Sequence, residues 1–263
     1  MFRIRTLHLA DLMVPWAHAT IQEPIHCWLV TDGERHIVVD TGVPGPDDMR
    51  RRLNVDSKGG GPDSLVAALQ AEGVAPDAVQ TVVLTHLHFD HAWNLELFAN
   101  AQLVVQRDEL IHAMDPVPTQ RIYYLRETLA AVLGRRRPKG LLLVDGDTEL
   151  MPGLAVMKAP GHTPGMQAAL VNTERGVAAL VSDCGDNYAN WYPADPDVNP
   201  RPLRYLGQDF LPGAIRSEGE LTYANSMRRV LARADIVVPA HDERIPRRMP
   251  EQWFAKPPSA ASA

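Results

Sequence analysis

The sequence is poor in cysteine, has no excess of basic residues and lacks a long apolar run, and each absence excludes a class of protein. Its two cysteines, Cys27 and Cys184, cannot build a disulfide framework, which fits a reducing compartment. Lysine and arginine total 26 against 32 aspartates and glutamates, whereas nucleic-acid-binding domains usually carry a basic face. No run approaches the roughly 18 apolar residues of a membrane-spanning helix. We therefore expect a cytoplasmic protein with no nucleic-acid or membrane partner.

The 263 residues have an ordinary globular composition. Hydrophobic residues make up 45% and charged residues 22%, which excludes disorder and a fibrous repeat. Near the N-terminus, His8, Asp11 and Pro15 interrupt the apolar core of a signal peptide, so we expect a first strand and a loop there. The absence of a low-complexity linker predicts one domain over residues 1–256, followed by a disordered tail at 257–263.

Short apolar runs that end at turn or polar residues predict buried strands. These runs are residues 27–30, 36–39, 81–85, 102–105, 141–144, 154–158, 167–171, 177–181 and 236–239. Helical patterns lie between them at residues 64–72, 95–100, 108–114, 120–133 and 222–233. The alternation favours helices packed on sheets over a helical bundle.

Three stretches predict loops: residues 43–63, the basic turn 135–139, and residues 187–218. The last is long and rich in proline and aromatic residues, which makes it a candidate cover for a substrate. The sequence also contains a short internal similarity, which we call the echo: Asp40 and Asp183 each end an apolar strand, and each is followed two residues later by glycine. This echo suggests two related halves rich in β-structure.

The most informative segment is Thr-His-Leu-His-Phe-Asp-His at residues 85–91. In an extended stretch, residues i and i+2 point to the same side, so His86 and His88 can reach one metal ion together. After the chain turns, Asp90 and His91 can offer a carboxylate and an imidazole to a second ion. Such ligands suit zinc, and also iron, manganese or cobalt. Burying these polar groups without partners costs several kcal/mol, so we interpret the segment as metal-binding.

Three later residues complete a candidate two-metal set. His162 lies in a turn rich in proline and glycine at residues 159–165, which holds its side chain in a fixed position. Asp183 and His241 each follow an apolar strand, where a polar side chain is presented at the edge of a sheet. Each residue alone is more often structural than metal-binding. Their shared position at strand ends favours a common site.

With these residues in view, the chain resembles the metallo-β-lactamase superfamily, whose signature His-x-His-x-Asp-His stands at residues 86–91. Within it, the sequence is most similar to the N-acyl-homoserine lactonase group at residues 38–42, 159–167 and 239–242. The resemblance implies an α/β fold, an αβ/βα sandwich of two mixed β-sheets with outer helices. The metals would lie in a cleft at one edge of the sheets.

The resemblance also implies the ligands, the cofactors and the reaction. Two divalent ions would be bound, with zinc favoured. One ion would be held by His86, His88 and His162, and the other by Asp90, His91 and His241. Asp183 would bridge both ions. A hydroxide that bridges the ions would attack the carbonyl of a lactone such as an N-acyl homoserine lactone. Asp90 would carry the proton to the leaving oxygen.

The chain departs from the lactonases where the substrate should lie. Some lactonases have a catalytic tyrosine three residues after the bridging aspartate, but this chain has Asp186 there. Tyr188 is the nearest phenol and our candidate oxyanion donor. Trp93 and Asn94 replace a common Gly-Gly. The expected substrate is a small molecule with an apolar portion, for which four aromatic residues could form a pocket: Trp16, Trp93, Trp191 and Tyr192.

We expect two further aspartates, the remaining histidines and Cys184 to have structural roles and not to bind metal. Asp40 and Asp242 are expected to orient ligating histidines. Cys184 is interpreted as a small buried residue. The other histidines are expected on the surface or satisfied in the core: His8, His18, His26, His36 and His112.

Several alternatives stay open at this point. A metallo-hydrolase of another ester, a thioester or a cyclic amide such as a β-lactam would use the same ligands. A persulfide dioxygenase-like enzyme with a single iron would need fewer of them. The acidic charge balance argues against a nuclease, and a non-enzymatic relative would be expected to lose ligands. Whether the chain is a monomer or a homodimer also stays open.

Overall fold

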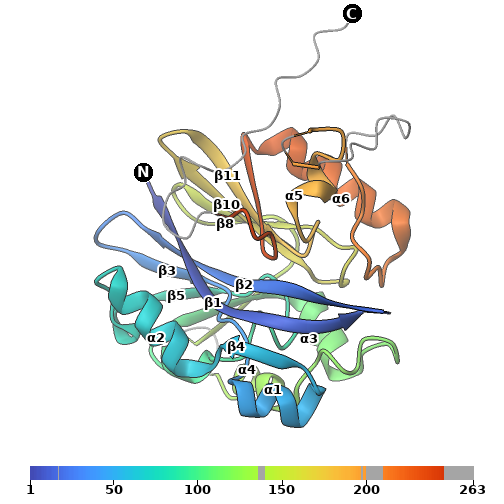
Figure 1. Ribbon diagram of the computed structural model, residues 1–263. Coiled ribbons are helices and arrows are strands. Elements are labelled where there is room, and N and C mark those ends of the chain that lie inside the picture. Colours follow the sequence, from blue (N-terminus) through green and yellow to red (C-terminus); the bar gives the residue numbers. More distant parts are fainter. Residues whose placement is uncertain (17, 136–139, 197, 200–209, 246–263) are drawn as a thin grey trace, which may run out of the picture.

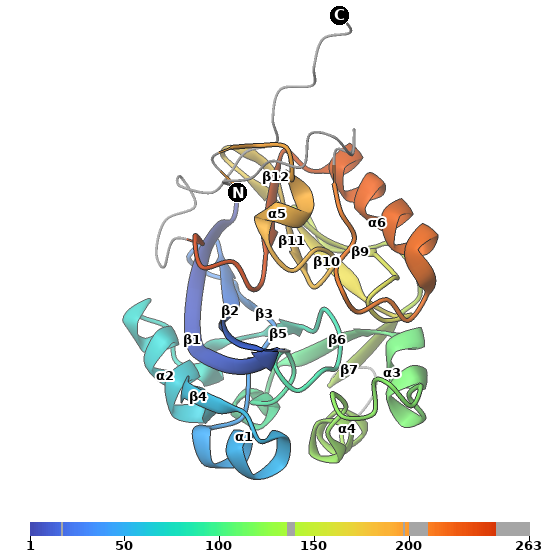
Figure 2. The ribbon, with the colours of Figure 1, turned by 45° about the vertical axis from the view of Figure 1, so that its right-hand side comes forward.

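The computed structural model describes residues 1–16, 18–135, 140–196, 198–199 and 210–245. Two mixed β-sheets face each other and helices cover their outer sides, which confirms the predicted αβ/βα sandwich (Figures 1 and 2). Two predicted features, the rest of the basic turn at 136–139 and the tail at 257–263, lie outside the described residues. Within the described ranges, no helix is both long and apolar enough to cross a membrane.

The first sheet has, within these residues, seven strands in the order β4-β1-β2-β3-β5-β6-β7. They are β1 (Arg3–Trp16), β2 (Ala19–Thr31), β3 (His36–Val39), β4 (Asp56–Gly59), β5 (Thr81–Val83), β6 (Gln102–Gln106) and β7 (Leu141–Val144). β4, β1, β2 and β3 pair antiparallel, whereas β3, β5, β6 and β7 run parallel. The outer side carries four α-helices and two short 3₁₀ turns: α1 (Pro46–Leu53), α2 (Gly61–Ala71), η1 (Pro76–Ala78), η2 (Leu95–Phe98), α3 (Arg107–Met114) and α4 (Arg126–Leu133).

The second sheet has, in the same described ranges, five strands in the order β12-β11-β10-β9-β8. They are β8 (Thr148–Met151), β9 (Leu154–Lys158), β10 (Gln167–Thr173), β11 (Gly176–Ser182) and β12 (Ile236–Pro239). Only the β11–β12 pair among them is parallel. The short helix α5 (Tyr188–Trp191) and the long helix α6 (Gly219–Arg233) cover this sheet (Figure 2).

The alternation of side chains along each strand divides the apolar residues between three layers. In β3, Ile37 and Val39 face the second sheet, where they pack with residues such as Val156 and Leu180. Val38, between them, packs under the helices of the first sheet. A separate cluster joins α6 to the outer side of β11 and β12. Both sheets are therefore buried on two faces, which explains why their strands read as continuous apolar runs.

The predicted loop at residues 43–63 is wrong, because it contains α1 and β4. Pro46 is suited to the first helical turn, where its missing N–H has no partner to lose, and the acidic residues after it favour the N-terminal end of the helix dipole. β4 then pairs along the edge of β1. Proline and glycine in this stretch mark the ends of short elements and do not exclude them.

Other boundaries also differ from the predictions. The N-terminal stretch is a 14-residue strand, β1, which pairs with β2 along nearly its whole length. The helix predicted at 120–133 begins only at Arg126, and residues before it form turns. β8 was not predicted, and the predicted helix at 95–100 is the 3₁₀ turn η2. In the described part of the predicted loop 187–218, residues 188–191 form α5.

The two sheets repeat one strand pattern. In the first, β1, β2 and β3 are antiparallel neighbours and β5 adds to β3 in parallel after a helical crossover. In the second, β9, β10 and β11 are antiparallel neighbours and β12 adds to β11 in parallel after α5 and α6. Asp40 follows β3 and Asp183 follows β11, so the echo in the sequence corresponds to equivalent places in the fold.

Candidate metal centre

The candidate ligands lie on loops that follow four strands. His86, His88, Asp90 and His91 come after β5, His162 after β9, Asp183 after β11 and His241 after β12. The structure brings all seven predicted side chains together in two groups that share Asp183. The first contains His86, His88 and His162, and the second contains Asp90, His91 and His241; in each group the donor atoms lie within 4.8 Å of one another.

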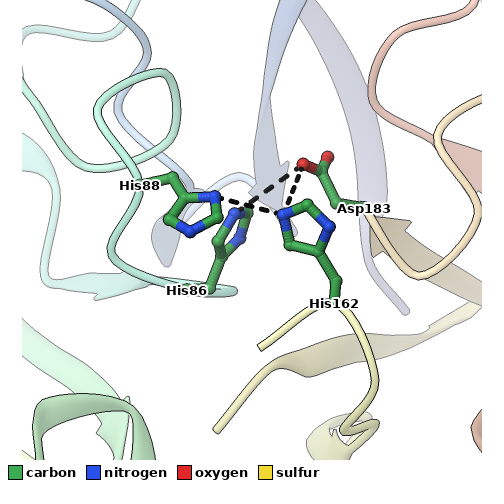
Figure 3. Close-up of side chains that lie close together, drawn as sticks. All are labelled: His86, His88, His162 and Asp183. Carbon is green, nitrogen blue, oxygen red and sulfur yellow. Dashed lines mark hydrogen bonds and ion pairs between the residues drawn. The ribbon is translucent and has the colours of Figure 1, made fainter. Parts of the chain in front are cut away.

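The first group is shown in Figure 3, where the imidazoles of His86 and His162 contact one oxygen of Asp183 and the imidazole of His88 contacts that of His162. Nε2 of His162 lies 3.1 Å from Nδ1 of His88 and 3.2 Å from Oδ2 of Asp183. Nε2 of His86 lies 3.7 Å from the same oxygen. Burial lowers the pKa of all three histidines. They are therefore neutral near pH 7, the form in which an imidazole nitrogen can bind a metal.

The second group converges on the other oxygen of Asp183. Oδ1 lies 3.1 Å from Nε2 of His241 and 3.3 Å from Nε2 of His91. Oδ2 of Asp90 lies 3.4 Å from the His91 nitrogen and 3.7 Å from that of His241. Burial opposes charge on the two histidines, but the carboxylates outweigh it and raise the pKa of His241 to about 10 and that of His91 above its usual range. This group therefore favours bound positive charge.

The donor atoms fit divalent metal ions. Nε2 of His86, His91 and His241 and Oδ1 of Asp183 are buried and, within the described residues, have no hydrogen-bond partner. A buried polar atom left in this state costs roughly 1–3 kcal/mol. Imidazole nitrogen and carboxylate oxygen are ligands that zinc and neighbouring transition metals accept, so bound ions would satisfy these atoms.

Asp40 orients one ligand, as the sequence predicted. Its Oδ2 lies 3.0 Å from Nδ1 of His91. The carboxylate also accepts hydrogen bonds from the backbone N–H and the hydroxyl of Thr85, at 2.8 Å each. Asp40 has a φ of 61°, a left-handed conformation that is uncommon for a residue other than glycine. The surrounding hydrogen bonds hold this conformation in place.

The expectation that Asp242 orients a ligating histidine is wrong. Its Oδ2 accepts a hydrogen bond from the backbone N–H of Tyr188, at the start of α5, and lies 2.6 Å from the guanidinium of Arg244. Within the described residues, the partners of the Asp242 carboxylate are Tyr188 and Arg244, and neither is a candidate ligand. His241 is held instead by the carbonyl oxygen of Pro24, which accepts from Nδ1 at 3.0 Å.

Glu109, on α3, is a supporting residue that the sequence reasoning missed. Its buried carboxylate accepts hydrogen bonds from the backbone N–H of Leu87 at 2.9 Å, the hydroxyl of Thr163 at 2.6 Å and that of Tyr124 at 2.9 Å. Leu87 lies between two ligands and Thr163 follows a third. Glu109 therefore connects both chain segments of the first group. Nothing in the sequence indicated this role, because Glu109 follows Arg107 and Asp108 in a charged first helical turn that is typical of an exposed position.

The aromatic residues lie differently from the predicted acyl pocket. Trp191 and Tyr192 are buried in the cluster between α6 and the second sheet, and Trp191 donates to the carbonyl of Gly185 at 3.0 Å. Trp93 is half-buried, with the guanidinium of Arg52 over its ring. The side chain of Trp16 lies outside the described residues. Tyr188 is fully buried beside Tyr192, and its role as oxyanion donor stays a prediction.

Two other side chains stand close to the ligands without having been predicted. The ring of Tyr123 lies 5.0 Å from that of His88 and stacks on Phe89. Burial and the charges of Asp90 and Glu23 raise the pKa of the Tyr123 phenol. Oε1 of Glu23 lies 4.0 Å from Nδ1 of His241. Tyr123 was missed because its segment was predicted to be helical, and Glu23 because topology alone brings β2 beside the last ligand.

The remaining histidines and Cys184 agree with their predicted structural roles. His26 is buried, with Nδ1 2.7 Å from the carbonyl oxygen of Ala240, and His8 contacts Asp11. Of the other three, His36 contacts Thr31, His112 contacts Gln120 and the ring of Tyr124, and His18 is exposed. Cys184 is buried, which raises the pKa of its thiol.

The fold and the paired histidine and aspartate groups agree with a comparison to known families. Residues 21–183, more than half of the chain, match the model of the metallo-beta-lactamase superfamily. The chain belongs to the metallo-beta-lactamase superfamily.

Individual relatives carry a more specific description. An N-acyl homoserine lactonase of Bacillus cereus is 30% identical over 177 residues, 64% of this chain and 66% of its own length. An N-acyl homoserine lactonase of Agrobacterium fabrum is 29% identical over 66% of this chain and 67% of its own. The chain thus spans about two thirds or less of the lactonases that it matches first. A solved N-acyl homoserine lactone hydrolase with N-hexanoyl-L-homoserine at its metal center shares the fold, with a TM-score of 0.66. The two chains are 23% identical in sequence, and the match covers 92% of this chain and 93% of the other.

Proposed function

We propose that this protein is a hydrolase that holds two divalent metal ions and opens the ring of a lactone, with N-acyl homoserine lactones as the substrate class. The observation that carries the proposal is the position of Asp183, which presents one carboxylate oxygen to each of two ligand groups. The relatives named as N-acyl homoserine lactonases support the choice of substrate. In a cell, such an activity would remove acyl homoserine lactone signals, which is known as quorum quenching.

The residues of the site have two roles in this proposal: six of them and Asp183 would bind the ions, and Asp90 would also transfer a proton. His86, His88 and His162 would hold one ion, Asp90, His91 and His241 the other, and Asp183 both. Bound divalent ions would supply a hydroxide near neutral pH and polarise the substrate carbonyl. The Asp90 side chain is 13% exposed, whereas the two histidines beside it are nearly buried. Asp90 would accept the proton of the hydroxide that adds to the carbonyl on a carboxylate oxygen and pass it to the leaving alkoxide as the ester C–O bond breaks.

The proposal also includes the identity of the metals, the binding partner and the location of the protein. Zinc is favoured by the nitrogen-rich ligand set, with iron, manganese and cobalt as alternatives. The partner is a small molecule, and a homodimer and a cytoplasmic location stay predictions. A single-iron persulfide dioxygenase is the competing function, and it would leave the second group without an ion.

The test compares metal-loaded wild-type protein with Asp90→Asn and with Asp145→Asn, which changes an exposed aspartate that belongs to neither ligand group. Proton release is measured on N-acyl homoserine lactones, other lactones, a thioester and a β-lactam, and bound metal is counted by mass spectrometry. We expect two ions per chain and lactone turnover that falls at least 100-fold in Asp90→Asn and is unchanged in Asp145→Asn. One bound iron with no hydrolysis of any substrate would overturn the proposal.

A further inference from the structure

We infer that Glu23 determines substrate specificity: its carboxylate accepts a hydrogen bond from a donor that the substrate carries close to its carbonyl, an amide N–H or an ammonium group. The inference rests on the proposed function, because it assumes that the reacting carbonyl lies at the two ligand groups. It concerns a residue of β2 that is far from every ligand in the sequence and is not itself a member of either ligand group.

The backbone around Glu23 is fixed to the metal centre from two sides. The carbonyl of Pro24, the next residue, accepts the hydrogen bond from Nδ1 of His241 at 3.0 Å. His26, two residues further along β2, contacts the carbonyl of Ala240 at 2.7 Å. The segment of β2 is therefore held against the loop that carries His241, and Glu23 keeps a constant position relative to that ligand.

The carboxylate of Glu23 lies beside the second group and is partly exposed to solvent. Its Oε1 is 4.0 Å from Nδ1 of His241, and its side chain remains 34% exposed. Since strand residues alternate in direction, the neighbouring Gln22 is exposed on the other side.

An ionised carboxylate only accepts hydrogen bonds, and this one has acceptor capacity to spare. The contact with His241 is its one ion pair within the described residues, and the Nδ1 proton already goes to Pro24. A substrate N–H or ammonium group beside the reacting carbonyl would find an acceptor here. A second carboxylate would be repelled. That repulsion also disfavours the product, since opening a lactone creates a carboxylate.

The experiment uses metal-loaded full-length protein and three lactones that differ in their donor group. An N-acyl homoserine lactone offers an amide N–H, α-amino-γ-butyrolactone offers an ammonium group, and a γ-alkyl-γ-butyrolactone offers neither. Values of kcat/KM are measured for wild type, Glu23→Gln, Glu23→Leu and Gln22→Leu, the last being a matched change at the adjacent, outward-facing position. Bound metal is counted for each variant.

We expect Glu23→Leu to lower kcat/KM about 10- to 100-fold for both nitrogen-bearing lactones and less than about twofold for the third, with metal content unchanged. Glu23→Gln should retain much of the turnover of the acyl lactone, because an amide oxygen still accepts, but lose that of the ammonium lactone. Gln22→Leu should behave as wild type.

Two other results would overturn the inference in distinguishable ways. Equal losses on all three lactones, or a loss of bound metal in both Glu23 variants, would make Glu23 a support for His241 and leave the proposed function intact. Wild-type protein that loads two ions and hydrolyses none of the lactones would overturn the proposed function and the role of Glu23 with it.

Discussion

Asp40, Glu109 and His26 each hold a different part of the metal centre in place. Asp40 fixes the ring of His91, Glu109 fixes the backbone on both sides of the first group, and His26 contacts the carbonyl of Ala240, just before His241. All three are buried. Their hydrogen bonds join residues of the chain to one another, so the positions of the ligands are set by the fold before an ion binds.

Because His26 is buried, its protonation should destabilise the protein in mild acid. Burial lowers the pKa of His26 to about 4 from a usual value of 6.5. Between these two values the unfolded chain binds a proton that the folded chain does not, so the free energy of unfolding falls as the pH falls, by up to about 3 kcal/mol. In His26→Gln, which can still donate to Ala240, this part of the decline should be missing.

Denaturant unfolding of the metal-free protein at several pH values from 4 to 7.5 measures the effect. The comparison of wild type with His26→Gln removes the contribution of the other histidines, and His18→Gln serves as an exposed control. Equal pH dependence in wild type and His26→Gln would contradict the assignment.

At the scale of elements, the loop between β9 and β10 packs directly on α3. A Cβ atom on Gly165 would overlap the backbone nitrogen of Glu109, which belongs to the first turn of the helix. This approach allows the hydroxyl of Thr163 to reach the Glu109 carboxylate. The loop and the helix therefore position His162 as one unit.

Substitution of Gly165 by alanine should separate the loop from α3. We expect Gly165→Ala to lower the free energy of unfolding by about 2 kcal/mol or more, because backbone must move, and to weaken metal binding by His162. Gly45→Ala is the control, since a Cβ there has only Gly61 within 4 Å, at 3.9 Å, and φ is −69°. Thermal unfolding and metal titration measure both effects. An unchanged melting temperature in Gly165→Ala would refute the packing argument.

The elements also show which parts of the molecule can be predicted from its sequence. Buried strands such as β3 and β11 are visible as apolar runs, and the ligands His86 to His91 are visible because they are adjacent along the chain. α1 and β4 were hidden, since each depends on packing against a neighbour that proline and glycine counts do not reveal. Glu23 and Tyr123 could not be placed, because the fold brings them to the site from segments far from any motif.

Taken as a whole, the molecule places its candidate metal ligands after strands of both sheets. His86 and His88 follow β5 of the first sheet, whereas His162, Asp183 and His241 follow strands of the second. Ions held between them would therefore stabilise the sandwich against separation of its sheets. The unfolded chain has no comparable site, so binding free energy adds to the free energy of unfolding.

Metal removal should lower the melting temperature. At a free ion concentration about 1,000 times the dissociation constant, binding contributes about 4 kcal/mol, which for a chain of this size corresponds to a shift on the order of 10 °C. Calorimetry with and without a chelator measures the shift. The variant Asp183→Asn, which alters the residue common to both groups, should respond much less to the chelator. An equal shift in the variant and in wild type would argue against Asp183 as the common ligand.

The repeated strand pattern of the two sheets has a consequence for the origin of the chain. Three antiparallel strands followed by a crossover to a fourth, parallel strand occur once in each half (Figure 2). Duplication and fusion of a gene for one half would produce this arrangement, and the two copies could then specialise. The aspartate after β3 now positions a histidine, while the aspartate after β11 faces both ligand groups. Under such a duplication, two equivalent positions would have taken complementary roles in the site.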